Sequence, residues 1–170
     1  NSAQQNYAVA IGRTAGQTTQ GNSAIAVGYL AGNSIQSSDA VAIGYQTGQF
    51  TQGQYGIAIG YQAGRNAQLA NTVAIGRSAG ITNQGGDGVA IGRQSGNLDQ
   101  QTNAIAIGLN AGNATQGSGS VAIGPSSGLT TQGALSVAVG QSAGQTSQSG
   151  GSVAVGYLSG RTSQGANSVA

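Results

Sequence analysis

Hydrophobic and polar residues alternate along this chain in a pattern that returns every sixteen residues. Val or Ile stands at position 9, at position 11 and at every sixteenth residue after each of them, and Ala always stands between the two. Gly at positions 12 and 16 and Gln at position 20 recur with the same period, in ten copies. A fixed period of this kind indicates a repeat architecture in which each unit packs on the next.

The segment Val-Ala-Ile-Gly predicts one short strand in every repeat, because β-branched residues alternate with a small residue and a glycine then ends the run. Helical repeats are excluded, since a two-helix unit needs about 33 residues. We expect a second short strand between the two glycines or just after the second one. The predicted fold is therefore all-β: a parallel β-solenoid, or β-roll, of ten 16-residue coils stacked at about 4.8 Å per layer.

The repeat runs through the whole chain, so we interpret residues 1–170 as a single β-solenoid region. The pattern begins and stops inside a repeat, and no atypical capping repeat is visible. Solenoids ordinarily carry such caps. The region would then be either a segment of a longer fibre or a unit that joins others end to end, and we expect the segment.

Alternation along the strand places the Val/Ile columns on one face and the Ala column on the other. Because Val and Ile are the larger apolar residues, we predict that they line the core. This predicted core seam includes Val9, Ile11, Val41, Ile43, Val73, Ile75, Ile105, Ile107, Val137 and Val139.

The Ala column would then face outward. Exposed columns vary in sequence, whereas this one is constant, so we predict that it is packed against other copies of the chain in a homo-oligomer. The alternative is that Ala merely suits a flat sheet surface. The predicted oligomer face includes Ala10, Ala42, Ala74, Ala90, Ala106 and Ala138.

Two further columns carry side chains that can interact from coil to coil. In-register Gln side chains can form a ladder of amide hydrogen bonds, and the predicted ladder includes Gln20, Gln52, Gln84, Gln116 and Gln148. The column at position 13 is rich in Tyr and Arg, which suit contact with sugar or protein; the alternative is a tolerant exposed ladder. This candidate contact stripe comprises Arg13, Tyr29, Tyr45, Tyr61, Arg77, Arg93 and Tyr157.

The amino-acid composition excludes most kinds of catalytic and metal-binding chemistry. The chain has no His, Cys, Met, Trp or Lys, and its only acidic residues are Asp39, Asp87 and Asp99. The usual metal ligands, thiols and general bases are therefore missing, and we expect no enzyme activity and no cofactor. With a net charge of +2 and five scattered Arg, nucleic-acid binding is not indicated, and no apolar run is long enough to span a membrane.

The runs Ser120–Gly124, Ser136–Gly140 and Ser152–Gly156 read SVAIG, SVAVG and SVAVG. They resemble the S-V-A-I-G repeats of the heads of YadA-like trimeric autotransporter adhesins, and similar strings occur in viral and phage fibres. The resemblance implies a left-handed parallel β-roll, three chains around one axis, a location outside the cell or on a virion, and a role in adhesion or as a spacer.

The leading functional hypothesis is a structural fibre or adhesin shaft, extracellular or on a virion, whose partners are further copies of itself, in a trimer or filament, and a host surface glycan or protein. Two alternatives remain. An ice-binding solenoid would need a regular file of Thr, and threonine is scattered here. A functional-amyloid-like extracellular filament would grow end to end.

Overall fold

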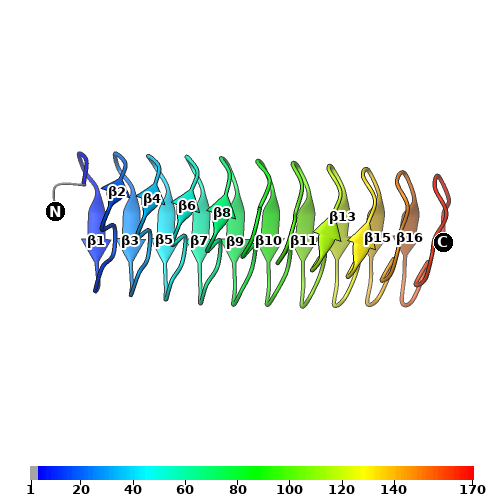
Figure 1. The fold of residues 1–170 in the computed structure, drawn as a ribbon. Helices are drawn as coiled ribbons and strands as arrows, with labels where there is room; N and C mark the ends of the chain where they lie inside the picture. Colours follow the sequence, from blue (N-terminus) through cyan, green and yellow to red (C-terminus); the bar gives the residue numbers. More distant parts are fainter. Residues whose placement is uncertain (1–3) are drawn as a thin grey trace.

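The structure, a computed structural model that describes residues 4–170, is a stack of coils wound around one axis (Figure 1). One three-residue strand per coil pairs in parallel in a ten-stranded sheet, and residues 4–170 contain no helix. The predicted parallel β-solenoid with 16-residue coils is confirmed. The ten strands are β1 (Val9–Ile11), β3 (Ile25–Val27), β5 (Val41–Ile43), β7 (Ile57–Ile59), β9 (Val73–Ile75), β10 (Val89–Ile91), β11 (Ile105–Ile107), β13 (Val121–Ile123), β15 (Val137–Val139) and β16 (Val153–Val155).

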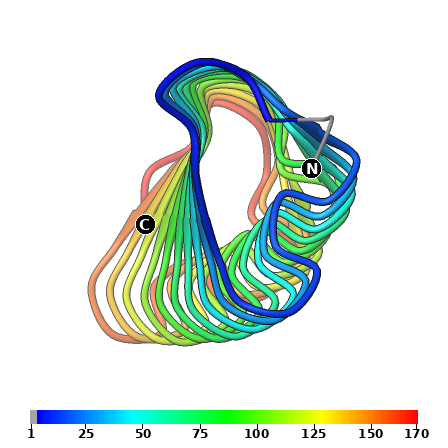
Figure 2. The same cartoon turned by 90° about the vertical axis from the view of Figure 1, so that its left-hand side faces the viewer.

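The register pairs each residue with the residue sixteen positions further on. Ala90 in β10, for example, lies opposite Ala106 in β11, and Val89 lies opposite Ile105. Seen along the axis, successive coils lie over one another and fan out gradually toward the C-terminus (Figure 2). Every column of the sequence is therefore a column in space, which lets the same side chain meet its own kind in the neighbouring coil.

A second, shorter set of strands lies behind the large sheet in Figure 1. These two-residue strands form one four-stranded and one two-stranded sheet, and isolated bridges between Gln68, Gln84, Gln100 and Gln116 connect them. The strands are β2 (Thr19–Gln20), β4 (Ile35–Gln36), β6 (Thr51–Gln52), β8 (Ala67–Gln68), β12 (Thr115–Gln116) and β14 (Thr131–Gln132).

The second strand thus begins three residues after the second glycine, which agrees with the second of the two expected places and not with a strand between the two glycines. That segment is a turn, because three of its residues have positive φ: in the first coil, Gly12 (125°), Thr14 (58°) and Gly16 (52°). A second turn reverses the chain at Ser23 (φ 56°) and its equivalents. A coil therefore consists of one strand of the large sheet, two tight turns and a second extended segment, which forms a two-residue strand in six of the coils.

The interior of the coil is built from small side chains and Gln. Ala26, Ala42 and the later members of the Ala column up to Ala154 are fully buried inside the single chain. Two more columns of small residues, which begin at Ala15 and Ala24, complete the interior together with the Gln column. The core of this protein is narrow, and its largest fully buried side chains are the glutamines.

The predicted core seam is therefore wrong, because the Val and Ile columns face outward. Ile11, Ile43 and Ile75 are 60%, 39% and 36% exposed; at the first strand position Val9 is exposed, and Val41 and Val73 are half-buried. The remaining members of the predicted seam also lie on this outer face: Val9, Val41, Val73, Ile105, Ile107, Val137 and Val139.

The physical reason is space. A 16-residue coil with two turns encloses a cross-section too narrow for two rows of β-branched side chains opposite a row of Gln. Protein interiors are close-packed, and enlarging a filled interior costs about 1–3 kcal/mol at each site. The constant Ala column marks the inside because only Ala fits there, whereas the outward Val and Ile meet no such limit.

Candidate interaction surfaces

The outer face of the ten-stranded sheet is a continuous apolar surface, which we call the Val/Ile face. Positions 9 and 11 of every coil project from it, and both columns contain only Val and Ile. These side chains stand side by side in parallel register along the whole stack. A single chain leaves this face uncovered.

The predicted oligomer face is not available for contact between chains. Ala42, Ala74 and Ala90 are fully buried inside the coil, and Ala10 packs against the interior cluster of Ala15 and Ala26. The same interior position holds for Ala106 and Ala138. Any association of chains through this sheet has to use Val and Ile instead.

The Gln column lies inside the coil and joins its two walls. The Nε2 group of Gln100 donates to the carbonyl oxygen of Val89 (2.8 Å) and to that of Ala104 (3.0 Å), both in the same coil. Equivalent pairs of bonds occur at the five predicted members, Gln20, Gln52, Gln84, Gln116 and Gln148. The sequence does not reveal these bonds between the two walls of one coil.

Amide bonds also link neighbouring coils, mostly in pairs. Gln100 Nε2 donates to Gln116 Oε1 (3.2 Å), and Gln36 Nε2 donates to Gln52 Oε1 (3.1 Å). The Oε1 atoms of Gln36, Gln68, Gln100 and Gln132 are buried and have no hydrogen-bond partner. The two N–H hydrogens of each amide already donate to carbonyl groups of the same coil. The Gln–Gln bond between coils is therefore secondary to these two bonds.

The candidate contact stripe is a stack of side chains along one edge of the Val/Ile face. The rings of Tyr29 and Tyr45, and those of Tyr45 and Tyr61, are stacked with centroids 5.1 Å apart. The guanidinium group of Arg13 lies 5.7 Å from the centre of the Tyr29 ring, which is a cation–π geometry. The stripe continues on the next coil with exposed Arg77.

The last two members of the stripe differ in their surroundings. Arg93 is exposed one coil beyond Arg77. Tyr157 lies four coils further along, is 71% exposed, and stands apart from the stacked rings. Six of the seven predicted residues therefore occupy consecutive coils, and one is separate.

The opposite edge of the Val/Ile face carries a column that sequence reasoning missed as a surface. It lies six residues before the stripe position in each passage across the sheet and includes Tyr7, Asp39, Tyr55 and Asp87, all exposed and all with φ near 60°. Two of the three acids of the chain, Asp39 and Asp87, stand in this column. The sequence signal was that each lies two residues before the Val-Ala-Ile segment of its coil.

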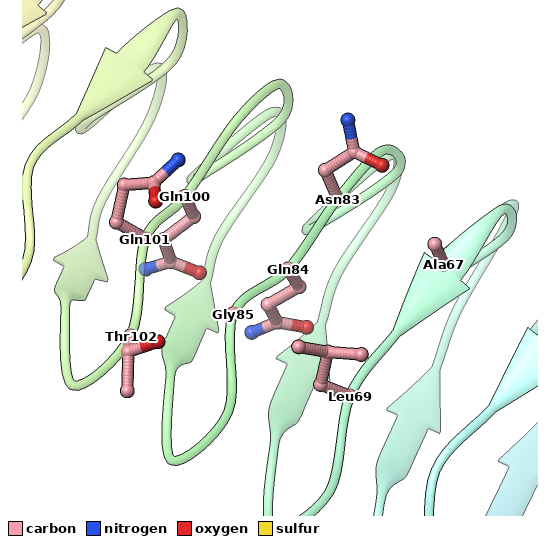
Figure 3. A pocket seen from close by; sticks show the side chains of 8 residues that line it. All are labelled: Ala67, Leu69, Asn83, Gln84, Gly85, Gln100, Gln101 and Thr102. Carbon is pink, nitrogen blue, oxygen red and sulfur yellow. The ribbon is translucent and has the colours of Figure 1, made fainter.

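A small hollow of about 210 Å³ opens beside β8, on the wall formed by the second set of strands. It exists because Gly85 occupies the column in which Leu69 and Gln101 stand on the neighbouring coils (Figure 3). Its remaining lining residues are neutral: Ala67, Asn83, Gln84, Gln100 and Thr102. Its lining contains no titratable side chain, so no group there could act as a general acid or base or activate the Thr102 hydroxyl.

Acidic groups do not converge in the part of the chain that the structure describes. Asp99 accepts a hydrogen bond from Asn83 Nδ2 (2.8 Å), on the far wall from Asp39 and Asp87. Residues 4–170 hold no group of three metal-binding side chains, and no helix among them could cross a membrane.

Threonine does not form a continuous file on the second wall. At the first position of that wall Thr115 lies next to Thr131, but Ala67, Asn83 and Asp99 interrupt the column.

Compared with known proteins, the chain matches no protein-family model and no curated sequence.

Proposed function

We propose that this chain is a structural, self-associating segment of a fibre or adhesin shaft, which displays a repeated surface outside the cell or on a virion. The observation that carries the proposal is the Val/Ile face: an uncharged, β-branched surface that runs the length of the stack and that one chain leaves exposed. Monomeric soluble proteins rarely expose an apolar patch larger than a few hundred Å².

The size of this face supports association. Nine spacings of about 4.8 Å make it about 43 Å long, and the three extended residues of each strand make it about 10 Å wide. Its flat footprint of about 430 Å² is about half of the roughly 800 Å² of accessible surface per partner in specific complexes. We infer that further copies of the chain cover it, and we expect a homotrimer.

The rest of the molecule supports a passive, rigid role. Internal Gln bonds brace the coils, the parallel register is uninterrupted in the large sheet, and the large variable side chains occupy outward columns. The S-V-A-I-G resemblance adds the extracellular or virion location and the adhesive role. A host glycan or protein would then contact outward columns that remain free in the assembly.

The test replaces Ile43, Ile75 and Ile123 together by Glu. All three are 36–39% exposed on the Val/Ile face, so three charges placed there should dissociate the assembly while each chain keeps its β-rich circular dichroism spectrum. A matched control replaces the exposed residues Thr19, Thr51 and Thr115, on the opposite wall, by Glu. A milder Ile→Thr triple at the same three positions retains β-branching if the Glu variant does not fold.

Light scattering measures the result. We expect the parent chain and the Thr→Glu control to have about three times the 16.4 kDa chain mass, and the Ile→Glu variant to have the mass of one chain. A parent chain that is monomeric at all concentrations, or an assembly that the Ile→Glu variant leaves intact, would refute association through this face.

A further inference from the structure

The two edges of the Val/Ile face carry opposite charges. The edge after the strand holds Arg13, Arg77 and Arg93, and the edge before it holds Asp39 and Asp87. Asp87 and Arg93 flank the same strand, β10, so they lie at the same level of the stack on opposite edges. Both are exposed, and within residues 4–170 neither is part of an ion pair.

Symmetry decides which edges meet when two copies place their Val/Ile faces together. A two-fold axis parallel to the stack, or any cyclic arrangement around such an axis, brings the Arg edge of one copy against the Asp edge of the next. A two-fold axis perpendicular to the stack makes the copies antiparallel, and it then brings the Arg edge against another Arg edge and the Asp edge against another Asp edge.

The parallel arrangement also matches the edges level by level. In register, Asp87 of one copy meets Arg93 of the other, with Arg77 one coil away. At two other levels the residues across the same passage are Tyr7 with Arg13 and Tyr55 with Tyr61. Cation–π and ring–ring contacts are favourable between such pairs.

We propose that copies of this chain associate in parallel and in register, and that the contact of Asp87 with Arg93 of the neighbouring copy selects this orientation. This inference rests on the proposed association through the Val/Ile face. The apolar columns alone are nearly the same in either direction, so they supply affinity without orientation. The edge charges supply the orientation, because like charges brought together at an interface cost several kcal/mol.

Charge reversal distinguishes the two orientations by the sign of its effect. In the parallel assembly Arg93→Asp places Asp against Asp87 of the neighbour, and the apparent dissociation constant should rise about tenfold or more. In an antiparallel assembly the same substitution would relieve the repulsion of the Arg edges and tighten association. Sedimentation velocity over a dilution series measures the constant.

Rescue provides the second arm of the experiment. Asp87→Arg alone should weaken association as Arg93→Asp does, and the double variant Asp87→Arg/Arg93→Asp should restore it, because every contact is again between opposite charges. Asp87→Asn, which suits the positive φ of this position, is a milder single variant. Asp99→Arg is the matched control, since Asp99 lies on neither edge and its reversal should leave association unchanged.

The possible failures are distinct. A parent chain that never associates overturns the proposed function and this inference together. An assembly that Arg93→Asp tightens or leaves unchanged, or that the double variant fails to restore, overturns only the parallel register and leaves association through the Val/Ile face standing. Weakening by both single variants with recovery in the double variant supports the inference.

Discussion

The amide of Gln100 reaches across its own coil to the backbone of Val89, and the bond from Nε2 to the carbonyl oxygen is 2.8 Å long. Val89 lies on the opposite wall, in β10, eleven residues earlier in the sequence. A polar group thus occupies the place that a large apolar side chain takes in most interiors, and it is paired there, as a buried polar group has to be.

We predict that Gln100→Glu destabilises the fold by about 3 kcal/mol or more, because it removes the donor to Val89 and Ala104 and places a carboxyl oxygen against two carbonyl oxygens. Urea unfolding measures the change. Gln101→Glu, on an exposed side chain one residue later, is the matched control and should stay within about 0.5 kcal/mol. Equal effects of the two substitutions would contradict the internal role of the column.

Gly92→Ala should be poorly tolerated. Gly92 has φ 122°, and a Cβ atom there would lie 2.7 Å from the carbonyl oxygen of Gly108 in the next coil. Backbone atoms cannot yield without opening the stack, so we expect a loss of more than about 2 kcal/mol. Gly86→Ala is the control, because its nearest neighbour would be the Ala70 oxygen at 3.6 Å. Comparable melting temperatures for the two variants would show that the close approach of the coils is unimportant.

Ala90→Leu tests the direction of the core. Ala90 is fully buried, so three added carbon atoms should overfill the coil and destabilise it by about 1–3 kcal/mol or more. Ile91→Leu changes the shape of a side chain that is 36% exposed and should cost less than about 1 kcal/mol in the dissociated chain. The denaturant midpoints of the two variants, measured at protein concentrations too low for association, provide the comparison. A larger loss of stability for Ile91→Leu than for Ala90→Leu would contradict the interior position of the Ala column and would indicate that Val and Ile face inward.

Tyr45→Ala should lower the stability of the stack by about 1 kcal/mol or more, because Tyr45 is stacked on both Tyr29 and Tyr61. Tyr157→Ala removes a ring that is 71% exposed, and we expect almost no change there. Since the chain has no Trp, tyrosine fluorescence follows the thermal unfolding of both variants directly. A parent-like melting temperature for Tyr45→Ala would mean that the stacked rings contribute no stability.

Periodicity by itself determined the coil length, the parallel register and the class of fold. The spacing of Val, Ala, Ile and Gly is constant, and in a parallel stack a constant spacing in sequence becomes a column in space. The same logic placed Tyr29, Tyr45 and Tyr61 on successive coils, where their rings stack at 5.1 Å.

Only the tertiary structure decided which face is inside. Hydrophobicity ranks Ile91 above Ala90 as a core residue, yet Ala90 is buried and Ile91 is partly exposed, because the size of the enclosed space and not the apolarity of the side chain sets the limit. The hydrogen-bond partners of Gln100 depend on how the turns close the coil, because the turns bring residues eleven positions apart into contact. The turns on either side of β10 likewise place Asp87 and Arg93 on opposite edges of the same strand.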